Sequence, residues 1–346
     1  MPEDGDRSDV LRVAYLGPEA SFSHQAAVDV FLPRQRPGLT VSLHPLPSFA
    51  SIFSAIQGSL PNHGDFDYAI VPMENSTNGS VVQVLDLLAQ CGLDVSALYP
   101  DLEVCAEYYL PVHHYLFVSA SSASVASSNV VLNGAPVNSS SAPPTKQDPF
   151  GKIQTLHTHP QVWGQCTRFL SEKFLGTERI DVGSTSTAAQ IASRDSSGRN
   201  AAIASRLAGE LNGLRCLAEN IEDEPGRNTT RFFVVRNKRR PVGKDLFSAS
   251  TTETKWKSLI TFTVPHSLPG SLAEALAVFK RFHFNLTRID TRPGRKRNWQ
   301  YVFFVECEET RVAGHDENLQ RMLDELGPHT ESLRYLGSLV DQLQEK

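Results

Sequence analysis

Short apolar runs alternate with segments of helical periodicity through the first 235 residues, and this alternation restricts the possible folds more than any other feature. Residues 11–16 form the first apolar run, which ends at Gly17-Pro18 and is followed by apolar residues at helical spacing. Similar runs at 41–46 and 68–73 are each followed by a helical pattern. The alternation predicts an α/β fold with a mainly parallel sheet, covered by helices on both faces, that binds ligands at the carboxyl ends of its strands.

The same pattern recurs farther along the chain, and we interpret it as two α/β lobes joined by two crossings. An extended run at 101–119 is long enough to pass between lobes, and 214–221 is predicted to return the chain to the first lobe. The predicted fold is two-lobed with a cleft, like a type II periplasmic binding protein. Within the second lobe, residues 120–149 are rich in Ser, Ala, Asn and Pro, which predicts a flexible surface insertion. The expected bounds are about 11–105 and 214–240 for lobe 1, and about 106–213 for lobe 2.

A different pattern begins after residues 241–256, a charged stretch rich in Pro, Gly, Ser and Thr that we interpret as a linker. From 257 to 346 the expected order is strand, helix, strand, strand, helix, strand. This βαββαβ order predicts a ferredoxin-like domain.

The composition indicates a soluble globular protein and excludes several functional classes. With 346 residues and a net charge of −5, the chain is long enough for two or three domains and lacks the field of a nucleic-acid-binding protein. Residues 1–10 are acidic and polar, unlike a signal peptide, and no apolar run reaches membrane-spanning length, so we expect a cytoplasmic protein without membrane contact. The five cysteines show no metal or pairing pattern, which predicts reduced, mostly buried thiols.

The most informative motif is Asn228-Thr229-Thr230-Arg231-Phe232, which follows a Pro-Gly turn and opens an apolar run. A guanidinium binds a carboxylate through two parallel hydrogen bonds, and neighbouring hydroxyls can donate to the same anion. Three other segments place hydroxyl groups between an apolar run and a helical pattern, where helix N-termini favour anions. Together they predict a site for a small anion; the three segments are Ser21–Gln25, Glu74–Ser80 and Ser184–Thr187.

Five motifs in this order resemble prephenate dehydratases that carry a C-terminal ACT domain. The resemblance covers about 11–235 and rests on Gly17–Ala27, Pro72–Ser76 with Gly79–Val81, His159–Gln161, Thr185–Ala189 and Asn228–Phe232. The C-terminal part resembles phenylalanine-binding ACT domains with changed motifs, Gly270-Ser271-Leu272-Ala273 and Asp290-Thr291-Arg292-Pro293. Two further departures are Ser21, where the family has threonine, and Thr158, where glutamate is common.

This resemblance implies a carbon-oxygen lyase that converts prephenate to phenylpyruvate, carbon dioxide and water, without a metal or organic cofactor. Thr230 is the expected hydrogen-bond donor to the departing hydroxyl, and Arg231 is the expected ligand of a substrate carboxylate. The other residues predicted to bind the substrate are Ser21, Asn75, Ser76, Ser80, Thr185, Ser186, Thr187, Asn228 and Phe232.

For the C-terminal domain, the resemblance implies feedback inhibition by phenylalanine and assembly into a homodimer or homotetramer through this domain. The alternative is a domain kept for dimerisation only. The residues expected to contact phenylalanine are Gly270, Ser271, Leu272, Asn285 and Asp290.

Three other functions fit parts of the same pattern. An arogenate dehydratase would catalyse the same reaction on arogenate, and the residues do not distinguish arogenate from prephenate as the substrate. A non-catalytic binding protein for small anions would share the two-lobed cleft, although the chain shows no export signal. A transcriptional regulator could contain both domain types, but the sequence shows no helix-turn-helix segment.

Overall fold

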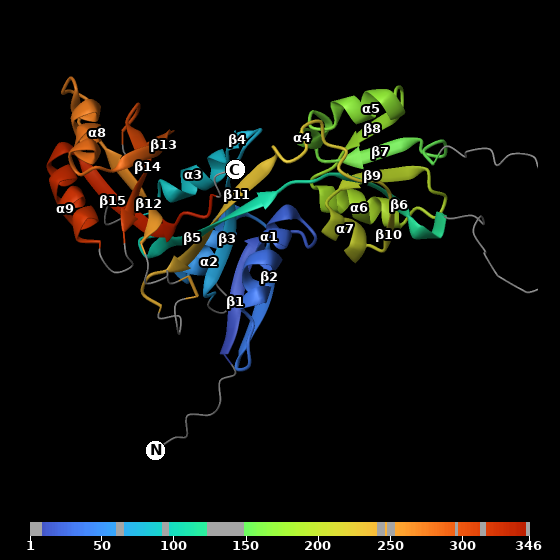
Figure 1. Cartoon of the computed structure of the whole chain (residues 1–346), viewed down its shortest axis with the longest axis horizontal. Helices are drawn as coiled ribbons and strands as arrows, with labels where there is room; N and C mark the ends of the chain where they lie inside the picture. The colour runs from blue at the N-terminus through green and yellow to red at the C-terminus, as the bar shows by residue number, and fades with distance from the viewer. Residues whose placement is uncertain are drawn as a thin grey trace, which may run out of the picture. The chain divides into compact units, whose positions relative to one another are not determined.

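The computed structural model describes residues 9–59, 66–91, 97–122, 149–240, 246–247, 253–294, 297–311 and 316–343. The chain has a mixed α/β fold and divides into two compact units, which are described separately (Figure 1). The first unit contains residues 1–17, 23–111 and 229–346, and the second contains 18–22 and 112–228.

The larger sheet of the first unit has the strand order β2-β1-β3-β11-β5, and the short strand β4 pairs with β3. Strand β1 runs parallel to β2 and β3, whereas β11 runs antiparallel to both β3 and β5. The elements are β1 (Asp9–Leu16), α1 (Phe22–Phe31), η1 (Leu32–Arg34), β2 (Leu39–Leu46), α2 (Phe49–Gln57), β3 (Tyr68–Asn75), β4 (Gly79–Ser80), α3 (Val82–Leu88), β5 (Leu102–Pro111) and β11 (Thr229–Asn237).

The two faces of this sheet bury different sets of side chains because successive residues of a strand point to opposite faces. On one face, Val71 and Phe233 belong to the core cluster formed with α2 and α3. On the other face, the Tyr68 ring lies 5.7 Å from that of Phe31 on α1. Helices therefore cover both faces, as the alternating sequence pattern predicts.

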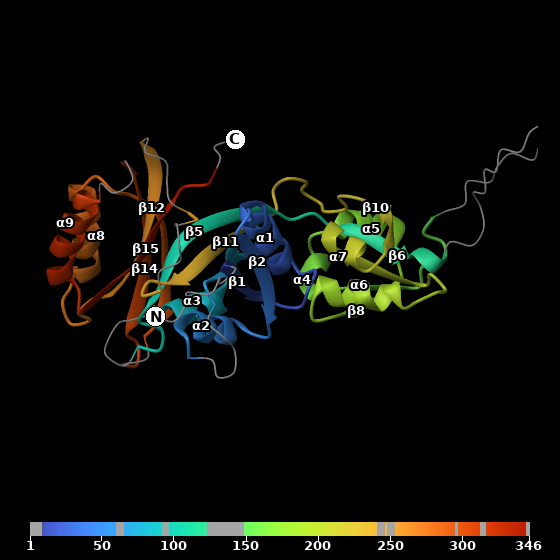
Figure 2. The ribbon, with the colours of Figure 1, turned by 90° about the horizontal axis from the view of Figure 1, so that it is seen from below.

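The C-terminal part of the first unit has the predicted βαββαβ order and the strand order β13-β14-β12-β15. Figure 2 shows α8 and α9 on one side of this sheet, where they share a core cluster with it. The opposite face packs on the larger sheet, so that Leu259 and Phe304 join the same cluster as Val104 and Phe233. The elements are β12 (Thr254–Thr263), α8 (Ser271–Arg281), β13 (Asn285–Pro293), β14 (Tyr301–Arg311), α9 (Glu317–Leu326), η3 (Gly327–His329) and β15 (Ser332–Val340).

Gly337 makes this close packing possible. Its φ of +133° lies in a region that L residues rarely adopt, and a Cβ at this position would lie 2.0 Å from the carbonyl oxygen of Val104. The register of β15 against β12 also shifts next to Gly337, at Leu259 and Ile260. A glycine at this bulge lets β15 approach the backbone of β5.

The second unit contains a sheet of strand order β10-β6-β9-β7-β8. Strand β7 runs parallel to β8 and β9, whereas β6 is antiparallel to β9 and β10. The elements are β6 (Tyr115–Ser119), η2 (Ala120–Ser122), β7 (Thr155–Thr158), α4 (Pro160–Trp163), α5 (Thr167–Lys173), β8 (Glu178–Asp181), α6 (Thr185–Ser193), β9 (Asn200–Ala204), α7 (Arg206–Leu211) and β10 (Leu214–Ala218).

Several predicted boundaries need correction. Residues 214–218 do not return the chain to the first unit, because they form β10, which pairs with β6 in the second. The return comes at 228–229, and 18–22 also belongs to the second unit. The predicted linker 241–256 overlaps the start of β12, and most of it lies outside the described residues, as does 123–148 of the predicted insertion.

Candidate functional site

Strands β3 and β11 bring together two of the predicted motifs. Their antiparallel register places Thr230 opposite Asn75 and Arg231 opposite Glu74. The register then shifts between Arg231 and Phe232, where the partner strand contains Pro72. Proline has no N–H to donate to a β-ladder, so an irregularity at this point is expected. The shift occurs within two residues of Thr230.

A direct hydrogen bond joins the side chains of the two motifs. Nδ2 of Asn75 donates to Oγ1 of Thr230 at 3.0 Å and to the carbonyl oxygen of Thr229 at 3.3 Å. Oδ1 of Asn75 accepts from the backbone N–H groups of Thr77 and Asn78, both at 3.0 Å, which fixes the amide orientation. Because Oγ1 of Thr230 already accepts from Asn75, the hydroxyl hydrogen is available for donation to another group.

Ser76 adds two contacts between the same segments. Its N–H donates to the carbonyl oxygen of Thr229 at 2.9 Å, and its Oγ accepts from the N–H of Thr229 at 2.9 Å. Both groups of Ser76 therefore hold the backbone on which Thr230 lies. Phe232, predicted to contact the substrate, is only 1% exposed and packs inside the unit.

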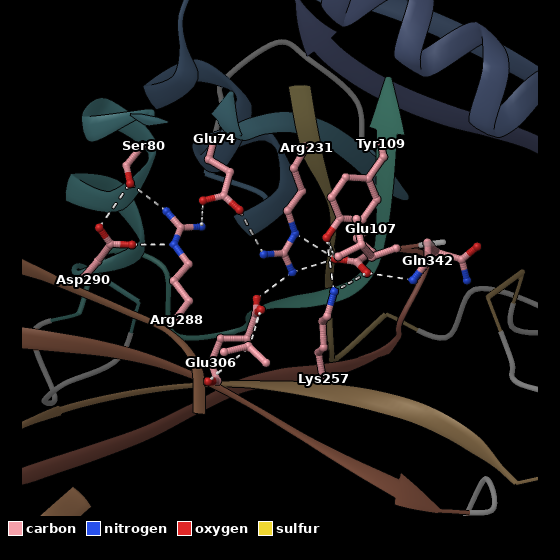
Figure 3. A network of polar contacts seen from close by, with 12 residues as sticks. Glu74, Ser80, Glu107, Tyr109, Arg231, Lys257, Arg288, Asp290, Glu306 and Gln342 are labelled. Carbon is pink, nitrogen blue, oxygen red and sulfur yellow. Dashed lines mark hydrogen bonds and ion pairs between the residues drawn. The ribbon is translucent and has the colours of Figure 1, made fainter. Parts of the chain in front are cut away.

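Arg231 lies in a set of ion pairs with protein carboxylates (Figure 3). Its Nη2 lies 2.6 Å from Oε2 of Glu306, its Nε donates to Oε2 of Glu107 at 2.8 Å, and its Nη1 lies 3.3 Å from Oε1 of Glu74. Burial opposes the charged form, but the charges of Glu306 and Glu107 outweigh it and raise the pKa of Arg231. The guanidinium thus has protein partners where the sequence predicted a substrate carboxylate.

Ser80, a predicted substrate ligand, is bonded to the C-terminal domain. Its Oγ donates to Oδ1 of Asp290 at 3.1 Å and accepts from Nη2 of Arg288 at 2.8 Å. Arg288 also contacts Oδ2 of Asp290 at 2.6 Å and Oε2 of Glu74 at 3.2 Å. A predicted substrate residue and a predicted phenylalanine residue are therefore directly hydrogen-bonded.

In the second unit, the predicted hydroxyl cluster lies at the start of α6. Ser184 is the N-cap, and its Oγ accepts from the N–H of Thr187 at 3.0 Å. Ser186 is completely buried and donates its hydroxyl to the carbonyl oxygen of Glu19. Thr185 is also buried. The same unit contains Asn228 and residues 18–22, so the structure brings Ser186 to the segment that carries Ser21.

The residues predicted to bind phenylalanine divide into two groups. Gly270, Ser271 and Leu272 line a cavity of about 250 Å³, together with Pro265, His266, Tyr301 and four neighbours. Asn285 and Asp290 do not line this cavity. Asn285 donates to Glu308 at 2.8 Å, and Asp290 contacts Ser80 and Arg288.

Sequence reasoning missed the residues that surround Arg231. Glu107 and Glu306 are buried, and Lys257 lies 3.2 Å from Glu107 and 2.7 Å from Asp341. Burial opposes the charge of Lys257, but Glu107 raises its pKa. Burial raises the pKa of Tyr109, which accepts a hydrogen bond from Lys257, to about 12. Glu306 gave a signal in the sequence, since it continues the alternation of the apolar residues Val302 and Phe304. Glu107 gave none, because a register shift in β5 puts it out of the alternation of Leu102 and Val104.

Other properties bear on the class of site. Within the described ranges, no group of three or more His, Cys, Asp or Glu side chains is arranged to hold a metal ion. None of the helices in those ranges has the length and apolar content needed to cross a bilayer. Cys91, Cys166 and Cys307 are buried, as predicted for most of the thiols, whereas Cys216 is exposed.

Comparisons with known proteins agree with the motifs. Residues 13–240 match the family model "Prephenate dehydratase". The prephenate dehydratase of Lactococcus lactis is 30% identical over 95% of this chain and 97% of its own length. A bifunctional chorismate mutase/prephenate dehydratase of Stutzerimonas stutzeri is 32% identical over 95% of this chain and 73% of its own length.

A solved structure shares the fold. The prephenate dehydratase from Arthrobacter aurescens, solved in complex with L-Phe, superposes with a TM-score of 0.71 and 22% identity, covering 96% of this chain and 90% of that one. The family match covers both motifs that meet at the Asn75–Thr230 hydrogen bond. The chain belongs to the prephenate dehydratase family, as its five ordered motifs predicted.

Proposed function

We propose that this chain is a cytoplasmic carbon-oxygen lyase that removes carbon dioxide and water from prephenate, with Thr230 as the hydrogen-bond donor to the departing hydroxyl. The observation that carries the proposal is the hydrogen bond from Asn75 to Oγ1 of Thr230. It orients the threonine so that its hydrogen is directed elsewhere, which a donor to a leaving oxygen requires. Family membership of residues 13–240 supports the choice of substrate.

The chemistry makes modest demands on the protein. The bond between the ring and its carboxylate breaks, its electron pair enters the ring, and the bond to the opposite hydroxyl breaks as that oxygen takes the leaving pair. The ring becomes aromatic, which supplies the driving force. The departing hydroxide then takes a proton from the solvent and becomes water. A threonine hydroxyl is too weak an acid to give up its proton unaided, so Thr230 stabilises the developing negative charge by hydrogen bonding.

The substrate carboxylates need positive partners, and we assign these mainly to backbone groups. The N–H groups in the first turn of α6, around Thr185 and Ser186, carry the positive end of the helix dipole. Ser21 belongs to the same unit and contributes a hydroxyl. Asn75 and Ser76 hold the Thr229–Thr230 backbone through hydrogen bonds. Arg231 has a positioning role in this scheme because its guanidinium already forms ion pairs with three protein carboxylates.

We further propose that the C-terminal domain is an ACT domain that binds phenylalanine at the cavity beside Gly270 and mediates assembly into dimers or tetramers. Gly270 has a φ of +86°, and a Cβ there would meet nothing within 4 Å, so its backbone is open beside the cavity. The related Arthrobacter structure contains L-Phe. Edge strand β13 has mostly exposed side chains, which suits pairing with a second copy.

The test is phenylpyruvate formation by the purified chain from prephenate, run beside arogenate and repeated with phenylalanine. We expect turnover of prephenate that phenylalanine suppresses. Thr230→Ala should lose about a hundredfold in kcat or more, since one oxyanion-type donor contributes about 10² to 10³. Thr230→Ser keeps the hydroxyl and should keep most activity. Full activity in the alanine variant would contradict the assigned role, and turnover of arogenate alone would change the substrate.

A further inference from the structure

The C-terminal domain meets the strand that carries Thr230 through a set of charged groups. We call Glu74, Glu107, Arg231, Lys257, Arg288, Asp290 and Glu306 the charge cluster (Figure 3). Three of its members lie on β3, β5 and β11 of the larger sheet, and four lie on β12, β13 and β14 of the C-terminal sheet. The ion pairs Arg231–Glu306, Arg288–Glu74 and Lys257–Glu107 join the two sheets.

The cluster is largely excluded from water. The side chains of Arg231, Glu107, Glu306 and Lys257 are 4%, 0%, 4% and 5% exposed. Charges removed from water are tolerated only when each keeps its partners, and removal of one partner leaves the other buried without compensation. The positions of these side chains, and of the strands that carry them, therefore depend on one another.

Two members of the cluster are direct neighbours of the proposed catalytic pair. Arg231 follows Thr230 on β11, and Glu74 precedes Asn75 on β3. Alternation along a strand directs Arg231 to the sheet face opposite Thr230, the face that also buries Phe233 against the C-terminal sheet. The C-terminal sheet thus contacts the reverse side of the backbone on which the Asn75–Thr230 hydrogen bond is built.

We propose that Glu306 and Arg288 are positioning residues for the dehydration reaction. Glu306 holds Arg231, and Arg288 holds Glu74 and Ser80, so that the C-terminal domain sets the geometry of the Asn75–Thr230 pair during turnover. This role rests on the proposed function. With this role, the C-terminal domain supports the geometry of the active site in addition to binding an effector.

The expected kinetic effect follows from the sensitivity of catalysis to geometry. A misplacement of about 1 Å by a distant change can cost about a hundredfold in rate. Glu306→Gln preserves the shape of the side chain and removes its charge, which leaves Arg231 with Glu107 and Glu74. We expect kcat to fall about tenfold to a hundredfold with little change in KM, because Glu306 does not touch the substrate. Glu306→Asp restores the charge at shorter reach and should recover part of kcat.

The controls separate this role from a general effect on folding. Glu325→Gln removes a carboxylate of the same domain that pairs with Arg281 at the surface, where both side chains are about half exposed. It should match the unmodified chain in kcat, KM and urea unfolding. Arg288→Gln is the second test, because Arg288 lies on an edge strand and its loss is less disruptive to folding than that of Glu306. It should lower kcat in the same way.

The outcomes are distinguishable. A loss of kcat in folded Glu306→Gln, with partial recovery in Glu306→Asp and none in the surface control, supports the proposal. Unchanged kcat in folded Glu306→Gln overturns it, and if that variant does not fold, unchanged kcat in Arg288→Gln overturns it. Absence of prephenate turnover in the unmodified chain would instead overturn the proposed function, and with it the positioning role.

Discussion

Replacement of Gly337 by alanine tests how the C-terminal sheet is joined to the larger sheet. The new Cβ would lie 2.0 Å from the carbonyl oxygen of Val104 and 3.0 Å from its carbonyl carbon. A carbon and an oxygen in non-bonded contact need about 3.3 Å. Strands β15 and β5 would therefore have to separate locally by about 1 Å, and the charge cluster lies on the same pair of sheets.

Two costs add in this variant. Forced overpacking in a well-packed interior costs about 1 to 3 kcal/mol. A backbone held at a sparsely populated positive φ costs an L residue about another 1 to 3 kcal/mol. We therefore expect Gly337→Ala to lower the free energy of unfolding by about 2 to 6 kcal/mol.

Gly38→Ala is the matched control because it carries one of the two costs. Gly38 has a φ of +86°, and a Cβ there would meet nothing within 4 Å. Urea unfolding can be followed by the fluorescence of the three tryptophans. The free energy of unfolding should be about 1 to 3 kcal/mol lower for Gly337→Ala than for Gly38→Ala. Equal stability of the two variants would refute the close contact between β15 and β5.

Two further predictions concern titratable groups outside the proposed site. Burial lowers the pKa of His114 below its ordinary 6.5, so the unfolded chain binds this proton at a higher pH than the folded chain does. The free energy of unfolding in urea should therefore fall as the pH drops below about 6.5. His114→Asn should reduce this pH dependence, and an unchanged slope would contradict the prediction. Burial raises the pKa of both Cys216 and Cys91, to about 12 for Cys91, but Cys216 is exposed and Cys91 is buried. A thiol reagent should therefore modify Cys216 before Cys91 in the folded chain, and prior modification of Cys91 would contradict the structure.

The alternating strand and helix pattern predicted much of the fold because it reflects local forces. The continuous apolar run of β3, which is buried on both faces, and the helical spacing of α2 depend only on near neighbours in sequence. The N-cap at Ser184 likewise has a local cause. The return crossing was predicted too early because 214–218 has the residue types of a strand, and its partner, β6, lies about a hundred positions away.

The candidate site was predictable only in part for a similar reason. The motifs at Asn75 and Thr230 meet because β11 runs antiparallel to β3, which places the amino end of β11 beside the carboxyl end of β3. The pattern of a mainly parallel sheet did not predict this pairing, whereas the family resemblance placed both motifs in one site. The ion-pair partners of Arg231 could not be predicted from its local sequence. Its partners Glu306 and Glu107 lie 75 and 124 positions away in the sequence, and an arginine beside two hydroxyls has the same local pattern whether it binds a substrate or a buried glutamate.

The contacts of Asp290 connect β4, in a motif predicted to bind the substrate, with β13 of the C-terminal domain. Its carboxylate contacts Ser80, from a motif predicted to bind the substrate, and Arg288, which lies on β13 of the C-terminal domain. An effector changes catalysis only if it binds two arrangements with different affinity. Any ligand that draws Asp290 or β13 away from Ser80 would also change the partners of Arg288, and through it those of Glu74, which neighbours Asn75. We therefore expect a shift of the Asp290 carboxylate to change the contacts of Arg288 and Glu74 without a change in fold.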